Sequence, residues 1–277
     1  MTSKRSAAAL RYLVRAAAFI TMAAIAFIVG YIVIKGVPNV TGDLFAWEYN
    51  SENVSLLPAL INTIFMTALS LLIAAPLGIF AAVYLTEYAK RGNKLVTLVR
   101  ITAETLAGIP SIIYGLFGAL FFVMALGWNL SLLSGAATLA IMILPLIMRT
   151  TEEALKSVPD SYREGSFGLG AGRLRTVFKV VLPSAAPGVL SGIILATGRV
   201  VGETAALIYT AGTVAKVAGS VMDSTRTLSV HMYVLSGEGL YMNQAYATAF
   251  VLLALVVGIN ALSSYIAKRV GKGGNDG

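Results

Sequence analysis

Apolar residues fill six long runs of this chain, separated by shorter segments that carry most of the charged side chains. The runs cover approximately residues 13–34, 58–85, 105–127, 134–150, 185–210 and 243–267. A helix needs about 20 apolar residues to cross the hydrocarbon core of a bilayer, so each run is a candidate span. Lipid offers no partner to backbone polar groups, and the alternating segments of about 10 residues that build a membrane β-barrel do not occur here. The pattern therefore predicts an all-α membrane protein with six transmembrane helices.

Composition and charge agree with this prediction and add an orientation. The chain is 57% hydrophobic and 12% charged, with a mean hydropathy of +0.80, which excludes an ordinary soluble domain. Of its 21 Lys and Arg residues, 17 lie in the four segments 1–15, 86–100, 149–180 and 268–277, whereas the connections on the other side hold three. Basic loops stay in the cytoplasm, so we expect both termini there. The net charge of +8 is spread over these segments, and it therefore gives little support to a nucleic-acid-binding face.

The first run is about 22 residues long, and four basic residues lie in the segment 1–15 at its start. A cleavable signal peptide has a shorter apolar core and a small-residue cleavage site, whereas Lys35-Gly36-Val37-Pro38 follows here. We expect a retained first span that also serves as the export signal.

The segment from Asp160 to Pro183, DSYREGSFGLGAGRLRTVFKVVLP, is a polar island between the fourth and fifth runs. Its charged residues make it too polar to cross a bilayer, and its many glycines and small residues leave one side nearly bare, so that another backbone can come close. Phe167, Leu169, Leu174 and Phe178 remain as apolar contacts on a predicted short helix-turn-helix.

The spacing within this island resembles the signature of permease subunits of ATP-driven bacterial importers. In that family Glu-Ala-Ala is followed after three residues by Gly and, nine residues later, by Ile-x-Leu-Pro. Here Gly and Ser replace the two alanines, and Val replaces Ile. The resemblance implies a type I ABC importer permease (MetI-like) fold, in which this stretch forms a coupling helix that docks into a groove on the ATPase subunit. It assigns ATPase coupling to Arg163, Glu164, Gly165, Ser166, Gly170, Val180, Leu182 and Pro183.

A charged pair lies inside the fifth run. Counting from Ser184 at 1.5 Å per residue puts Arg199 about 22 Å along the predicted helix, where a charge costs about 2.5–3.5 kcal/mol to insert. Glu203 follows at i+4, on the same face of that helix. One interpretation is an internal ion pair that locks two helices together. The other is that Arg199 offers a planar set of donors to an anion, with Glu203 holding it when the site is empty.

The sequence around this pair, Gly198-Arg199-Val200-Val201-Gly202-Glu203-Thr204-Ala205-Ala206, resembles the fifth-helix motif of the permeases of the phosphate-specific transport (Pst) system. Gly108-Ile109-Pro110-Ser111 is similar to another element of these permeases. The resemblance implies a PstA-type permease in the bacterial inner membrane, with Arg199 and Glu203 in phosphate translocation. It also implies a homologous permease (PstC type), an ATPase dimer (PstB type) and an external phosphate-binding protein (PstS type) as partners.

Under this interpretation the chain is no enzyme and binds no cofactor, because ATP and Mg²⁺ belong to the partner ATPase. The sequence agrees, since it has no phosphate-binding Gly-x-x-x-x-Gly-Lys-Ser/Thr loop, no zinc-type spacing and no Gly-x-Ser-x-Gly elbow. It has no cysteine, which excludes disulfides and thiolate metal sites. Three alternatives stay open: a permease for another oxyanion such as molybdate or sulfate, an ion-driven secondary transporter, and a non-transporting membrane scaffold.

We expect three parts in the chain. Residues 1–57 hold an N-terminal cytoplasmic tail, the first span and an external loop. Residues 58–267 form the permease core with five spans and the coupling loop 150–183, and residues 268–277 form a flexible cytoplasmic tail. The fourth span is expected to begin near Ser131. In the last external connection, a short helix is expected around Leu228 to Leu235, and the single histidine, His231, is expected to be solvent-exposed.

Overall fold

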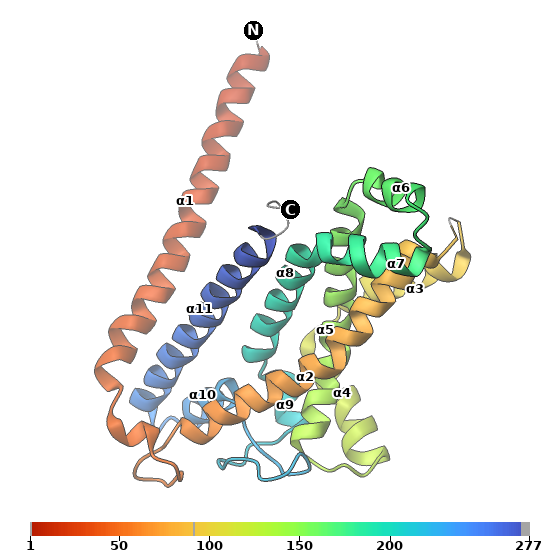
Figure 1. Ribbon diagram of the computed structural model, residues 1–277. Helices are drawn as coiled ribbons and strands as arrows, with labels where there is room; N and C mark the ends of the chain where they lie inside the picture. The colour runs from red at the N-terminus through yellow and green to blue at the C-terminus, as the bar shows by residue number, and fades with distance from the viewer. Residues whose placement is uncertain (1, 91, 273–277) are drawn as a thin grey trace.

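The computed structural model describes residues 2–90 and 92–272, which form helices and connecting turns without any strand. The helices are α1 (Thr2–Gly36), α2 (Leu57–Val83), α3 (Lys94–Ala107), α4 (Ser111–Gly118), α5 (Leu132–Ser157), α6 (Asp160–Gly168), α7 (Arg173–Thr176), α8 (Leu182–Val201), α9 (Ala205–Thr210), α10 (Leu228–Glu238) and α11 (Met242–Lys272) (Figure 1). Two 3₁₀ turns, η1 (Val37–Asn39) and η2 (Gly42–Phe45), follow α1. Three π-helical segments, η3 (Tyr84–Tyr88), η4 (Ala119–Ala125) and η5 (Val177–Val181), continue α2, continue α4 and join α7 to α8.

The predicted all-α architecture is confirmed. Five helical segments of the described chain are long and apolar enough to cross a membrane: Ala9–Asn39, Leu57–Tyr88, Leu132–Ser157, Arg173–Val201 and Met242–Tyr265. A bent pair, Lys94–Ala107 with Ser111–Ala125, makes the sixth span when it is counted as one crossing. The fourth span begins where the sequence predicts, since Ser131 is the N-cap of α5. At the C-terminus α11 continues to Lys272, and residues 273–277 of the predicted tail lie outside the described residues.

The third predicted span, 105–127, is broken at residues 108–110. α3 begins at Lys94, inside the basic segment expected to be a loop, and its axis makes an angle of 102° with that of α4. Pro110 precedes α4 in an extended conformation and has no N–H to continue the ladder. The Tyr114 hydroxyl donates to the Leu106 carbonyl oxygen at 2.7 Å, which satisfies one of the carbonyls left free at the end of α3.

α5 lies at the centre of the bundle and packs against both α2 and α8. Its Leu139, Ile143 and Ile147 side chains are fully buried. Glycines bring the neighbouring helices close: a Cβ on Gly78 of α2 would lie 2.9 Å from Ile147 Cγ2, and one on Gly188 of α8 would lie 2.6 Å from Ala154 Cβ. Small residues thus allow the helices around this core to approach closely, as they do in other membrane helices.

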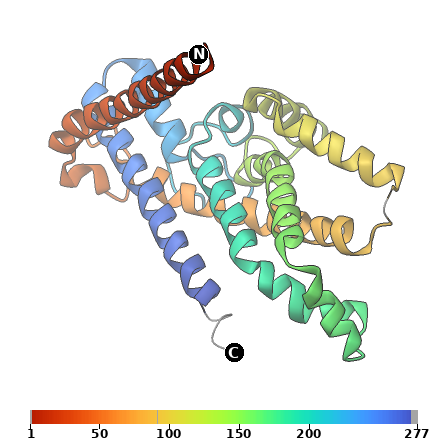
Figure 2. The same cartoon turned by 90° about the horizontal axis from the view of Figure 1, so that it is seen from above.

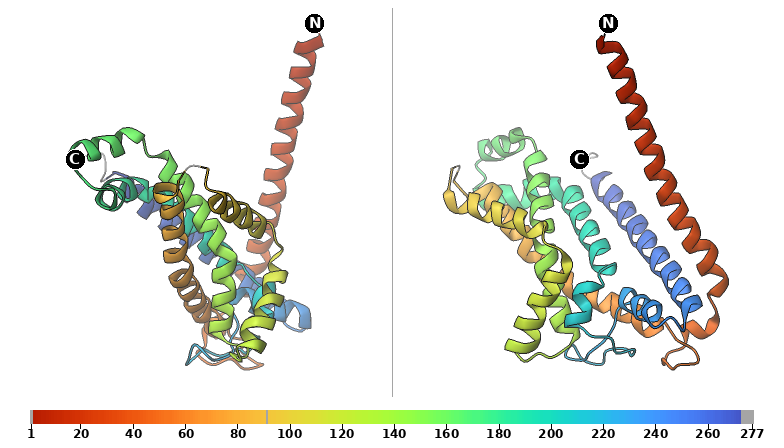
Figure 3. Two further views of the ribbon diagram at one scale, coloured as in Figure 1. Left: turned by 90° about the vertical axis from the view of Figure 1, so that its right-hand side faces the viewer. Right: turned by 180° about the vertical axis from the view of Figure 1, so that it is seen from behind.

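α1 lies outside this core and packs along α11 (Figure 3). The two helices share a contact between the Tyr31 and Tyr246 hydroxyls at 3.2 Å. Seen from above, α1 and the α6–α7 segment lie on opposite sides of the molecule (Figure 2). The start of α1, the end of α11 and α6 nevertheless occupy the same end of the bundle (Figure 1). This agrees with the expectation that both termini share a side with the polar island.

Two side chains of α2 anchor the loop at the opposite end. Asn62 Nδ2 donates to the Lys216 carbonyl oxygen at 2.8 Å, and Asn62 Oδ1 accepts the Ala218 N–H at 3.0 Å. Thr63 Oγ1 accepts the Leu228 N–H at 2.8 Å, which holds the start of α10. The predicted short helix around Leu228 to Leu235 is therefore present and fixed on α2.

The prediction that His231 is solvent-exposed is wrong. His231 lies on the inner face of α10 with 0% of its surface exposed, and its ring meets that of Tyr49 edge-on, with the centroids 6.1 Å apart. Burial and the neighbouring Arg226 guanidinium lower the pKa of His231 to about 3. The imidazole is thus neutral at physiological pH.

Candidate functional site

The polar island folds as a short helix, a tight turn and a second helix. α6 starts after Pro159 and ends in a Schellman motif: the Ala171 N–H donates to the Ser166 carbonyl oxygen at 3.1 Å, and the Gly170 N–H donates to that of Phe167 at 2.9 Å. Gly170 has φ +80°, a left-handed conformation that a residue with a Cβ adopts only at a cost. The glycine of the signature is therefore a requirement of the backbone.

The outer surface of α6 and its turn is bare. A Cβ placed on Gly165, Gly168, Gly170 or Gly172 would meet no described atom within 4 Å. Leu169, at the tip of the turn, is 91% exposed, and Glu164 and Phe167 are also exposed. We call this exposed patch of open glycines and apolar side chains the α6 surface.

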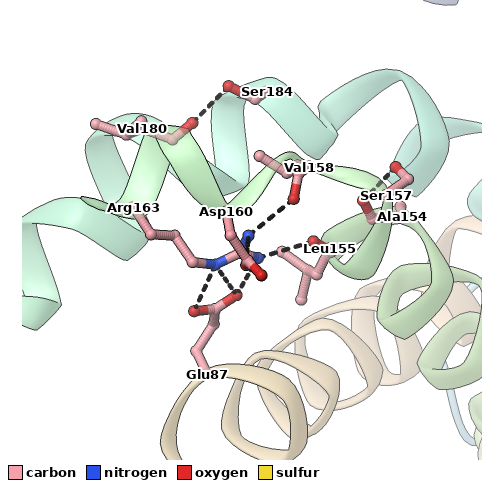
Figure 4. A network of polar contacts seen from close by, with 9 residues as sticks. All are labelled: Glu87, Ala154, Leu155, Ser157, Val158, Asp160, Arg163, Val180 and Ser184. Atoms are coloured by element: carbon pink, nitrogen blue, oxygen red, sulfur yellow. Dashed lines mark hydrogen bonds and ion pairs between the residues drawn. The ribbon is translucent and has the colours of Figure 1, made fainter. Parts of the chain in front are cut away.

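Arg163 points the other way, toward the bundle (Figure 4). Its Nη2 donates to Glu87 Oε1 at 2.7 Å and to the Leu155 carbonyl oxygen at 2.9 Å, and its Nη1 donates to the Val158 carbonyl oxygen at 2.8 Å and to Asp160 Oδ1 at 3.2 Å. The hydrogen bond to Glu87 is the largest of the effects that raise the pKa of the guanidinium. Arg163 is therefore an internal contact, on the far side of α6 from the α6 surface.

The remaining signature residues start the fifth span. Ser166 Oγ lies 2.8 Å from Thr176 Oγ1 and ties α6 to α7. Pro183 is in the first turn of α8, where a missing N–H costs nothing, and Leu182 packs against the buried cluster around Val181. The Val180 carbonyl oxygen accepts from Ser184 Oγ at 2.7 Å. These residues orient α8 relative to α6.

The second predicted site needs a correction, because Arg199 and Glu203 do not lie on one helix face. α8 ends at Val201, and Glu203 falls in the break before α9. Its Oε1 accepts the Ala206 N–H at 3.1 Å, which satisfies a free donor in the first turn of α9. Arg199 and Glu203 form no ion pair with each other. This structure therefore does not contain the internal ion pair suggested by i,i+4 spacing, because α8 ends at Val201, with Gly202 as its C-cap.

The two broken spans meet beside Arg199. A Cβ on Gly115 of α4 would lie 2.7 Å from the Ala206 Cα of α9, so the segments after the two breaks cross in close contact. Ala107, at the end of α3, lines the same cavity as Arg199. Transporters commonly place their binding sites where membrane helices are interrupted, because the freed backbone groups and nearby side chains face a cavity there.

A cavity of about 250 Å³ opens next to Arg199, between α3, α5 and α8. Its charged lining residues are Arg100, Glu104, Arg149, Glu152, Glu153, Lys156 and Arg199. The nearly buried Glu152 Oε1 lies 2.7 Å from Arg100 Nη2 and 2.6 Å from Lys156 Nζ, and Arg149 pairs with Glu153 at 3.0 Å. Arg199 is the one arginine of this lining without an ion pair to a described residue.

Comparison with known proteins places this arrangement in a family. The profile of the family "Binding-protein-dependent transport system inner membrane component" matches residues 74–272, which is most of the chain and includes the polar island and both breaks. This chain belongs to that family. It is thus an inner-membrane component of a transport system and not an enzyme.

Individual relatives of this transport component agree. The probable ABC transporter permease protein YqgI of Bacillus subtilis is 39% identical over 184 residues, covering 66% of this chain and 62% of that protein. The phosphate transport system permease protein PstA of Xylella fastidiosa (strain Temecula1) is 36% identical over 212 residues, covering 73% of each. The chain thus spans less than two thirds of the first relative's length.

Solved structures confirm the fold of the binding-protein-dependent component. An inward-facing structure of the MetNI methionine ABC transporter aligns with a TM-score of 0.60 and 22% identity, covering 78% of this chain and 94% of that one. A bacterial alginate ABC transporter aligns with a TM-score of 0.67 and 16% identity, covering 95% and 96%. The predicted MetI-like importer fold is therefore confirmed.

Sequence reasoning missed Glu87 and Glu152 as partners in this transport component. Each is an acidic residue in a segment otherwise rich in Lys and Arg, and that contrast is the signal by which they could have been found. Arg100 pairs with Glu152, which is 52 residues away in the sequence.

Proposed function

We propose that this chain is the inner-membrane permease subunit of an ATP-driven phosphate importer. The family supports a role in binding-protein-dependent import, and relatives named as phosphate transport system permeases support the substrate. In this proposal the chain forms half of the translocation pathway, and a homologous PstC-type permease forms the other half. Two PstB-type ATPase subunits carry ATP and Mg²⁺, and an external PstS-type protein delivers phosphate.

Arg199 is the proposed anion contact, and its lack of an ion pair is the observation that carries this assignment. Arg100 and Lys156 share the Glu152 carboxylate, and Arg149 pairs with Glu153, whereas the Arg199 guanidinium has no ion pair to a described residue and is free to take a tetrahedral oxyanion in two-pronged geometry. Glu203 acts by position: its carboxylate holds the start of α9 and so keeps the break beside Arg199 in place.

The α6 surface is the proposed contact with the ATPase. Glu164, Gly165, Phe167 and Leu169 would enter a groove on that subunit, and closure of the ATPase dimer would move α6 and with it α8. The four basic segments support a location of this end of the bundle, and with it of both termini, in the cytoplasm of a bacterial cell.

Uptake of labelled phosphate by proteoliposomes with the complete importer tests the assignment of Arg199. Arg199→Gln removes a charge-assisted hydrogen bond of about 1.5–3 kcal/mol, so we expect ATP-driven uptake to fall at least about tenfold while membrane insertion is unchanged. Lys216→Gln is the matched control, because it removes one positive charge from an exposed residue at the end of the bundle opposite α6. Wild-type uptake by Arg199→Gln would refute the site.

The same assay separates the alternatives. Competition by molybdate or sulfate at equal concentration, with little effect of unlabelled phosphate, would identify a permease for another oxyanion. Uptake that needs an ion gradient and no ATP would identify a secondary transporter, which also uses broken helices. Absence of any uptake with all partners present would favour a scaffold.

A further inference from the structure

α6 is not held to the bundle by apolar packing. None of its residues is fully buried, and the segments it packs against are η5 and α7, which continue into α8. Between the end of α2, α3 and α6 lies a polar cavity of about 700 Å³, lined by residues such as Lys90, Arg100 and Arg173. α6 therefore reaches α8 through η5, whereas its movement can reach α2 across this cavity only through a specific connection.

Arg163 makes that connection at two points. Through Nε and Nη2 it donates to both carboxylate oxygens of Glu87, in η3 at the end of α2. Through Nη1 and Nη2 it donates to the Val158 and Leu155 carbonyl oxygens, at the C-terminal end of α5. One guanidinium thus joins α6 to the ends of both helices (Figure 4).

The Glu87–Arg163 ion pair is largely shielded from solvent and is fixed in its orientation. Glu87 is only 9% exposed and the Arg163 side chain 16% exposed, so solvent screens the pair poorly. A guanidinium fork bound to a carboxylate fixes orientation as well as distance. α2 runs from η3 to the opposite end of the bundle and packs against α5 along the way (Figure 1). A displacement of α6 would therefore reach the whole span through Glu87.

We infer that the Glu87–Arg163 pair is the mechanical link by which movement of α6 is transmitted to α2, and that Glu87 is a positioning residue for transport. The inference rests on the proposed function, in which ATP-driven movement enters at α6. Without Glu87, the ATPase would still dock on the α6 surface and hydrolyse ATP, but α6 would move without carrying α2. ATP hydrolysis and uptake would then be uncoupled.

The test measures ATP hydrolysis and phosphate uptake in the same proteoliposomes containing the complete importer. Glu87→Gln keeps the shape of the side chain and removes its charge. We expect it to retain the ATPase subunit and near-normal hydrolysis, with phosphate moved per ATP lowered about tenfold, the effect of losing roughly one charge-assisted bond. Asp160→Asn is the matched control, because Asp160 contacts the same guanidinium from a side chain that is 82% exposed, and we expect no change.

Reconnection by a cross-link provides the second arm. The chain has no cysteine, so Glu87→Cys with Arg163→Cys places the only two thiols of this subunit on either side of the link. Each single substitution should uncouple transport, and a bifunctional thiol reagent on the double variant, in a complex whose other subunits lack cysteine, should restore phosphate moved per ATP. Wild-type coupling in Glu87→Gln, loss of the ATPase subunit from it, or no recovery on cross-linking would overturn the inference. A wild-type complex without ATP-driven phosphate uptake would instead refute the proposed function.

Discussion

Gly118 lies where the bent third span crosses α5 and α9, and replacing it with alanine tests this packing directly. The new Cβ would collide with Thr138 Oγ1 and would lie 2.7 Å from Thr210 Cγ2 and 3.0 Å from Thr138 Cγ2. Neither threonine can move freely, because Thr138 Oγ1 donates to the Ser134 carbonyl oxygen and Thr210 Oγ1 to the Ala206 carbonyl oxygen, each at 2.8 Å. Overpacking of this kind costs about 1–3 kcal/mol.

Thermal unfolding of the purified protein in detergent measures this cost. Gly30→Ala in α1 is the matched control, since its Cβ meets nothing within 4 Å and it shares the gain in helix propensity. A difference of roughly 2 kcal/mol between the two variants corresponds to about 4–8 °C in Tm, with Gly118→Ala the lower. Adding Thr138→Ala to the Gly118→Ala variant should restore most of the lost Tm. Equal Tm values for Gly118→Ala and Gly30→Ala would show that the crossing is not as close as described.

Three further predictions concern stability and assembly. Burial lowers the pKa of His231 from 6.5 to about 3, so the unfolded chain takes up this proton at a higher pH than the folded chain does. As the pH is lowered from 6.5 to about 3, the free energy of unfolding should therefore fall by about 1.4 kcal/mol per pH unit. His231→Phe should remove this part of the pH dependence of Tm, and an unchanged slope would contradict the buried neutral imidazole. Glu152→Gln should lower the free energy of unfolding by about 1 kcal/mol, because Arg100 and Lys156 lose their shared carboxylate. Glu153→Gln removes one partner of an exposed ion pair and should leave the stability nearly unchanged. Equal Tm values for the two variants would argue against a stabilising role of Glu152. Gly170→Val puts a branched side chain at φ +80° and should distort the α6 turn, so that less ATPase subunit copurifies; wild-type recovery would count against the role of that turn.

The spans, the polar island and the shared side of the termini could be predicted because each depends on local composition. Runs of about 20 apolar residues are sufficient to recognise a membrane helix, and a stretch with Arg163 and Glu164 among glycines is too polar to be one. The Ser131 boundary also followed from local sequence, since its hydroxyl caps α5 by accepting the Ser134 N–H.

The breaks in the spans could not be located in the same way. Apolar character continues through Gly202 to Thr210, so hydropathy alone predicts one helix. The helix is interrupted there because α9 packs against Gly115 of α4 and because the Glu203 carboxylate caps the start of α9. Both causes depend on tertiary structure. The 102° bend at Pro110 likewise exceeds what a proline alone predicts.

Long-range partners were also beyond local reasoning. Glu87 and Arg163 are 76 residues apart, and nothing near either one identifies the other. His231 is carried into the interior because α10 packs on α11 and α2, and its ring lies against that of Tyr49. The partners of charged and polar residues thus depend on the tertiary structure, whereas the positions of the apolar spans can be predicted from the sequence pattern.

Coupling to ATP hydrolysis requires, in this proposal, that the α6 surface receives the ATPase subunit. Leu169→Cys places a single reactive thiol at the most exposed point of that surface in an otherwise cysteine-free chain, and Val214→Cys places one at the opposite end of the bundle. With a photoactivatable thiol-linked reagent on the assembled importer, position 169 should cross-link to the ATPase subunit and position 214 should not. A cross-link to the ATPase from position 214, or none from position 169 in an importer that is active in uptake, would contradict the account.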